Sequence, residues 1–130
     1  MAQSKLDVYR DVSIETQNPV KLIVLLYDGA VKFLRVAQSK LAEGDYVGKG
    51  QFIARTQAII AELNAVLNFE EGGEVATLLR QLYQFMFVHL GEANVERDPA
   101  RIDTVISMLQ GLNESWRAVA TRYPAGVAAE

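Results

Sequence analysis

Prolines and glycine-containing turns divide this chain into four long segments, each with apolar residues at helical spacing. Asn18-Pro19 and Asp98-Pro99 each match an N-cap followed by a first helical residue, and Pro124 follows the last periodic segment. Gly44-Asp45 and Glu70-Glu71-Gly72-Gly73 mark two further breaks. Short connections make neighbouring helices antiparallel, so we predict an all-α, up-down four-helix bundle. The predicted helices cover residues 18–43, 45–68, 73–96 and 98–122.

The length and composition fit one helical domain over residues 1–130. Hydrophobic residues make up 50% of the chain and charged residues 22%, a balance typical of globular proteins and not of disordered ones. Within this domain we predict an N-terminal tail or short extra helix at 1–16, the bundle at 18–122 and a frayed end at 123–130.

Charge, hydropathy and cysteine content limit the kinds of partner that we expect the protein to bind and the compartment in which we expect it. The net charge is -3 and no basic stripe is visible, which argues against nucleic-acid binding. No apolar run reaches the roughly 20 residues of a membrane-spanning helix, and the N-terminus lacks the apolar core of a signal peptide. The absence of cysteine fits a reducing compartment. We therefore expect a soluble, cytoplasmic protein, a monomer or weak homodimer that binds neither nucleic acid nor membranes.

Apolar residues on the first and third predicted helices spread over more than one face. The main stripe of the third helix is expected at Val75, Leu78, Leu79, Leu82, Phe85, Met86, His89 and Ala93. Further apolar side chains outside the main stripes are Val24, Leu25, Val31 and Val36 on the first helix, and Tyr83, Phe87 and Val88 on the third. A four-helix bundle has one central core, so either the tail or another chain should cover this surplus.

The second predicted helix carries a row of alanines opposite its Ile/Leu stripe. The row is Ala54, Ala58, Ala61 and Ala65. Alanine is the best helix former and can simply fill a solvent-facing side. Alternatively, these small residues form a shallow floor on which a partner helix lies closely.

The residues needed for catalysis or metal binding are not arranged in a recognisable pattern. His89 is the only histidine and has no Glu three positions before it, so the Glu-x-x-His motif of di-iron bundles is missing. We expect His89 to be a hydrogen-bonded structural residue and Asp28 to belong to a surface network. No catalytic residue, metal site or cofactor is predicted.

Several distinctive motifs follow one another along the chain. They are NPVKLIVLLYDGAVKFL at 18–34, RTQAIIAELNAVL at 55–67, FEEGGEVATLLRQLYQFM at 69–86 and LGEANVERD at 90–98, together with Tyr9 and Trp116. In this order they resemble the FliS family of flagellar proteins, and the resemblance covers roughly residues 9–117. Phe87-Val88 departs from it, because basic residues are expected there in the family.

The resemblance implies a non-enzymatic cytoplasmic helical bundle. Such a protein binds the C-terminal segment of flagellin, prevents premature polymerisation and helps to hand the subunit to the flagellar type III export apparatus. A competing hypothesis is a homo-oligomeric bundle whose surplus apolar surface mediates self-association. A cofactor- or metal-carrying bundle enzyme is disfavoured by the missing ligands.

The tail contains four apolar side chains that a four-helix core does not need: Leu6, Tyr9, Val12 and Ile14. They either cover one end of the bundle permanently or, as the resemblance implies, occupy part of the client groove until flagellin arrives. The candidate partner-binding residues are therefore Tyr9, Val12, Ile14, Ala54, Ala58, Ala61, Ala65 and Phe87.

Overall fold

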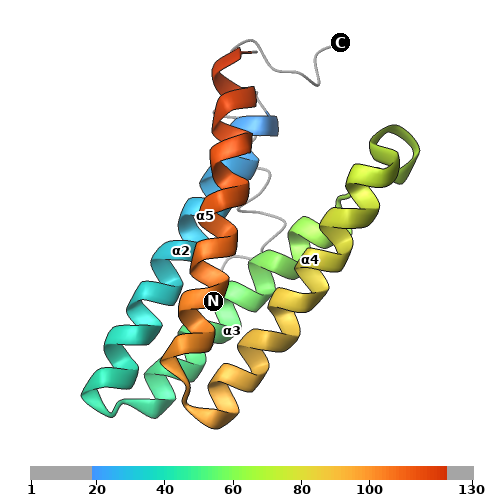
Figure 1. Ribbon diagram of the computed structural model, residues 1–130. Helices are drawn as coiled ribbons and strands as arrows, with labels where there is room; N and C mark the ends of the chain where they lie inside the picture. The colour runs from blue at the N-terminus through green and yellow to red at the C-terminus, as the bar shows by residue number, and fades with distance from the viewer. Residues whose placement is uncertain (1–18, 123–130) are drawn as a thin grey trace, which may run out of the picture.

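The structure, a computed structural model, describes residues 19–122, which form four α-helices. These are α2 (Pro19–Glu43), α3 (Tyr46–Ala65), α4 (Phe69–Glu96) and α5 (Pro99–Arg122), shown in Figure 1. Each helix packs against the next, and α5 also packs against α2, so α2 and α4 lie diagonally across the bundle. The predicted all-α, antiparallel four-helix bundle is confirmed for this part of the chain.

The helices begin and end at the residues that the local chemistry favours. The Asp45 carboxylate accepts a hydrogen bond from the Gly48 amide at 2.9 Å and caps the N-terminus of α3. Asp98 accepts from the Ala100 amide at 3.0 Å, directly beside Pro99 at the start of α5. Gly44 has a φ of +81°, a left-handed value that glycine adopts without strain. Because this value is not helical, α2 ends just before Gly44.

The third helix begins at Phe69, four residues before the predicted start at residue 73. α4 begins at Phe69, because the Asn68 side chain accepts from the Glu71 amide at 3.1 Å and because Glu70 and Glu71 favour a helix N-terminus. Gly73 lies inside α4 with φ 50° and ψ -123°, so the helix is kinked there. Gly73 therefore separates a first helical turn at 69–72 from the rest of α4, and the predicted break at the glycine pair is present as a kink inside the helix.

The core is built from side chains of all four helices. The largest fully buried ones are Tyr27, Leu34, Ile53, Thr56, Ile60, Met86, Leu90, Ile102, Val105 and Leu109. The Tyr27 hydroxyl contacts the Tyr83 hydroxyl at 2.6 Å and so joins α2 to α4 across the diagonal of the bundle. Of the surplus on α2, Val24 is buried and Leu25 remains half exposed.

The buried face of α4 is rotated by about one residue from the predicted stripe. Its buried residues recur at alternating three- and four-residue spacing: Ala76, Leu79, Tyr83, Met86, Leu90 and Ala93. The prediction that Val75, Leu78 and Phe85 face the core is wrong, since all three are exposed. Apolar residues flank the true core line on both sides, so the sequence pattern alone could not choose between them.

The two halves of the bundle do not run parallel along their whole length. In Figure 1, α3 and α4 lean away from α2 and α5 toward the end that holds the α3–α4 turn. The four helices come together at the opposite end, where the α2–α3 and α4–α5 turns lie. The sides of α4 therefore receive less cover from neighbouring helices than a closed bundle would give them.

Candidate functional site

A surface hollow of about 550 Å³ lies between α3 and α4, and we call it the α3–α4 hollow. Its lining consists of Ile60, Ala61 and Asn64 of α3 and Tyr83, Gln84, Phe87 and Val88 of α4. None of these seven side chains is charged. Phe87 and Val88 are 42% and 59% exposed, so two large apolar side chains border the hollow with much of their surface open to solvent. The lining offers apolar contact together with two amide side chains.

The floor of this hollow is formed by side chains that also belong to the buried core. Ile60 and Tyr83 are 1% and 2% exposed, and the Tyr83 hydroxyl is fixed by its contact with Tyr27. Burial raises the pKa of Tyr27, an effect partly opposed by its hydrogen bonds to Tyr83 and Trp116. Tyr27 therefore stays neutral at physiological pH, and its hydroxyl holds the Tyr83 ring in the floor of the hollow.

The structure brings together two of the predicted partner-binding residues, Ala61 and Phe87, on opposite walls of the hollow. Within the alanine row, Ala54, Ala61 and Ala65 are exposed and Ala58 is partly buried. Ala61 is the member of the row that lines the hollow. The predicted tail residues lie outside the described part of the chain: Tyr9, Val12 and Ile14.

A second group of exposed apolar side chains lies on the other side of α4 and was assigned to the core by the sequence pattern. Leu78 and Phe85 are exposed there, and Phe85 stacks on His89 with ring centroids 4.9 Å apart. His89 Nδ1 lies 3.3 Å from an Arg101 nitrogen of α5. The prediction that His89 is a hydrogen-bonded structural residue is confirmed. The wide apolar arc on this helix was the only sequence signal for an exposed face.

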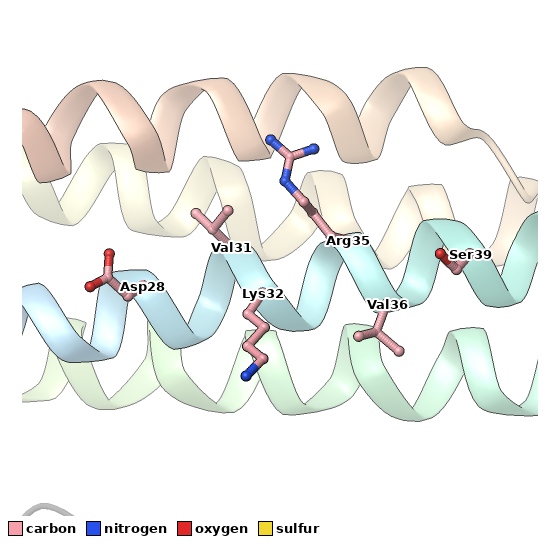
Figure 2. A pocket seen from close by; sticks show the side chains of 6 residues that line it. All are labelled: Asp28, Val31, Lys32, Arg35, Val36 and Ser39. Carbon is pink, nitrogen blue, oxygen red and sulfur yellow. The ribbon is translucent and has the colours of Figure 1, made fainter.

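A shallower hollow of about 430 Å³ lies on α2 alone, and we call it the α2 hollow (Figure 2). Its lining residues are Asp28, Val31, Lys32, Arg35, Val36 and Ser39. Figure 2 shows the side chains of Arg35 and Lys32 pointing to opposite sides of the helix. Unlike the α3–α4 hollow, this surface is open and carries charges of both signs.

Motif residues that carry the family resemblance act as links between helices. Asp28 of α2 accepts from Asn113 Nδ2 at 2.9 Å and also pairs with Arg117, both on α5. Asn94 of α4 accepts from Lys49 Nζ of α3 at 2.5 Å through its side chain and at 2.8 Å through its backbone carbonyl. Burial, and then the charge of Arg97, lower the pKa of Lys49. These polar residues therefore link α2 to α5 and α3 to α4.

The part of the chain that the structure describes, residues 19–122, contains neither a candidate metal site nor a candidate membrane span. No group of three or more His, Cys, Asp or Glu side chains there could hold a metal ion. None of the helices in that range is both long enough and apolar enough to cross a membrane.

The chain is similar to known proteins along nearly its whole length. The family model described as Flagellar protein FliS matches residues 1–123. The flagellar secretion chaperone FliS of Campylobacter jejuni is 40% identical over 103 residues, covering 79% of this chain and 80% of that protein. The FliS chaperone of Salmonella typhimurium is 36% identical over 124 residues, 92% of each chain. That of Vibrio cholerae is 30% identical over 132 residues, covering 98% of this chain and 97% of that protein. The chain therefore belongs to the FliS family of flagellar secretion chaperones, which are binding proteins and not enzymes.

Proposed function

We propose that this protein binds the C-terminal segment of flagellin in the cytoplasm, prevents its premature polymerisation and assists its delivery to the flagellar type III export apparatus. The observation that carries the proposal is the uncharged α3–α4 hollow with Phe87 and Val88 exposed at its edge. An amphipathic helix binds to such a surface by placing its apolar face into the groove. A secretion chaperone requires a surface of this kind for an export substrate that is not yet folded.

The proposed contact extends beyond the hollow itself. Each fully buried Leu or Val of a partner contributes roughly 1.5–3 kcal/mol. Association and ordering of the partner cost on the order of 4–15 kcal/mol. Several anchors are therefore needed, and we propose that the client also covers the exposed alanines Ala54 and Ala65 on α3 and the partly buried Ala58. In this proposal the free chaperone is a monomer or a weak homodimer, and the tail residues Tyr9, Val12 and Ile14 belong to the same binding surface.

A substitution in the hollow tests the proposal. The wild-type protein should form a one-to-one complex with the C-terminal segment of flagellin, and circular dichroism of the mixture should show more helix than the sum of the components. Ala61→Glu should leave the free protein folded, because Ala61 is exposed. The variant should bind the segment at least about tenfold more weakly, because the partner would desolvate the carboxylate.

The matched control is Ala118→Glu, which introduces the same side chain at an exposed position of α5 outside the hollow. Its affinity for the segment should equal that of the wild type. No complex with the wild-type protein would rule out the client. If the free protein also formed a stable oligomer in native mass spectrometry, the self-association hypothesis would be favoured. Equal losses in Ala61→Glu and Ala118→Glu would instead place the client elsewhere on the surface.

A further inference from the structure

Two amide side chains of α3 face α4 one heptad apart, and only one of them has a hydrogen-bond partner. Gln57 Nε2 donates to the backbone carbonyl of Phe87 at 3.0 Å. Asn64 lies seven residues further along α3, a rise of about 10.5 Å. Its side-chain oxygen Oδ1 is buried and has no hydrogen-bond partner within the described residues. The polar contacts between α3 and α4 therefore stop at the α3–α4 hollow, which Asn64 lines.

Two other buried polar side-chain atoms in residues 19–122 lack a hydrogen bond, but their surroundings differ from those of Asn64 Oδ1. Arg101 Nε lies 3.3 Å from a Glu96 carboxylate oxygen and takes part in an ion-pair cluster. Asn113 uses its other amide atom to donate to Asp28. Asn64 combines an unpaired buried oxygen with a place in the wall of a solvent-open hollow.

An unpaired buried carbonyl oxygen lowers the stability of the free protein, because it has lost water without gaining a donor. A leucine at this position would fill a similar volume without that penalty. Stability of the free bundle therefore does not account for an asparagine here. A donor supplied from outside the bundle does account for it.

We propose that the Asn64 side chain, which lines the hollow, turns its Oδ1 toward the bound client and there accepts, as a specificity-determining acceptor, a hydrogen bond from a neutral polar client side chain. This proposal rests on the proposed function. The donor is Ser, Thr, Asn or Gln, seated between apolar anchors of the client helix. Lys and Arg are excluded because no side chain of the hollow carries a negative charge to compensate a desolvated cation. Gln84, on the opposite wall, can donate in return to the same client side chain.

The first test compares Asn64→Leu and Asn64→Ala with Gln51→Leu, a control at an exposed position of α3 outside the hollow. Thermal unfolding reports the stability of each free protein, and calorimetric titration reports its Kd for the flagellin C-terminal segment. Both Asn64 variants should melt at or above the wild-type temperature and bind roughly tenfold more weakly, since the client donor is left unpaired. Gln51→Leu should bind like the wild type.

Tight binding by both Asn64 variants, with unchanged or raised melting temperatures, would overturn the proposal and leave a water molecule as the partner of Oδ1. If the wild-type protein does not bind the segment, the proposed function fails, and the role of Asn64 fails with it. If the wild type binds and the variants bind equally well, the client assignment survives and only the role of Asn64 is lost. The two failures are therefore distinguishable.

The second test identifies the donor. Each Ser, Thr, Asn and Gln of the segment is replaced in turn by alanine, and binding is measured with the wild-type protein and with Asn64→Ala. One client substitution should weaken binding to the wild type by about tenfold and have little further effect on the variant, as coupled partners do in a double-mutant cycle. A scan in which every substitution acts equally on both proteins would contradict the proposal.

Discussion

At the scale of single residues, the tyrosine pair connects a buried motif position to the candidate binding surface. Tyr27 is fully buried in α2, yet its partner Tyr83 forms part of the floor of the α3–α4 hollow. The hydroxyl contact of 2.6 Å fixes the depth at which the Tyr83 ring lies. The motif residue Tyr27 thus contacts the candidate binding surface through the core, without being exposed itself.

The phenylalanine variant of Tyr27 tests this link. Near pH 7, Tyr27→Phe should lower the free energy of unfolding by about 1 kcal/mol, because one buried hydrogen bond is lost. Burial raises the pKa of Tyr27 above 10.0 in the folded state, so at alkaline pH the unfolded state releases the proton first. Its contribution to stability is therefore present below pH 10 and is lost as the pH rises through the folded-state pKa. Urea unfolding between about pH 7 and about pH 10.5 should show a shallower alkaline decline for the variant, and identical slopes would contradict this account.

The candidate site could be predicted only partly from single residues. Ala61 and Phe87 were named from their patterns, and the structure places both in one hollow. Asn64 was not named, because nothing in its type or spacing shows that its oxygen lacks a donor. That property depends on which carbonyls and amides of α4 come within reach, and only the packed helices determine it.

At the scale of elements, α4 is the helix for which sequence reasoning was least accurate. Its start was predicted at 73 because Gly72-Gly73 normally breaks a helix, but the Asn68 cap begins the helix earlier. Its buried face was misjudged because Leu78 and Phe85 are as apolar as the true core residues. At the other helix ends, the capping residues and prolines coincide with the ends of the apolar pattern. The local sequence was therefore enough to predict approximately where those helices begin and end.

The backbone at Gly73 gives a test of the kink. Its φ of 50° is one that side-chain-bearing residues rarely adopt, so Gly73→Ala should lower the free energy of unfolding by about 1–3 kcal/mol. Gly111, in α5, has no positive φ and open space around it, so Gly111→Ala should raise the free energy of unfolding by about 0.5–1 kcal/mol. Chemical denaturation of both variants measures these changes. A stabilised Gly73→Ala variant would show that α4 runs straight through this position.

At the scale of the whole molecule, the four-helix architecture follows from the sequence, whereas the placement of its open surfaces does not. Three prolines and two glycine-containing breaks were enough to predict four antiparallel helices. The lean of α3 and α4 away from the other two helices (Figure 1) is not indicated by any local sequence pattern. Phe87 and Leu78 are exposed on different sides of α4, and the apolar pattern did not distinguish Leu78 from the core residues.

The chemistry of the two hollows leads to a prediction that decides which of them holds the client. The α3–α4 hollow has no charged lining residue, whereas Asp28, Lys32 and Arg35 line the α2 hollow (Figure 2). Salt screens exposed charges but leaves apolar burial intact, so the Kd for the flagellin segment should change by less than about threefold between about 50 and about 500 mM NaCl. A double variant with Lys32→Ala and Arg35→Ala should bind like the wild type at both salt concentrations. If high salt instead greatly weakened binding to the wild type but not to the double variant, the client would lie on α2. The assignment of the client to the α3–α4 hollow would then be wrong.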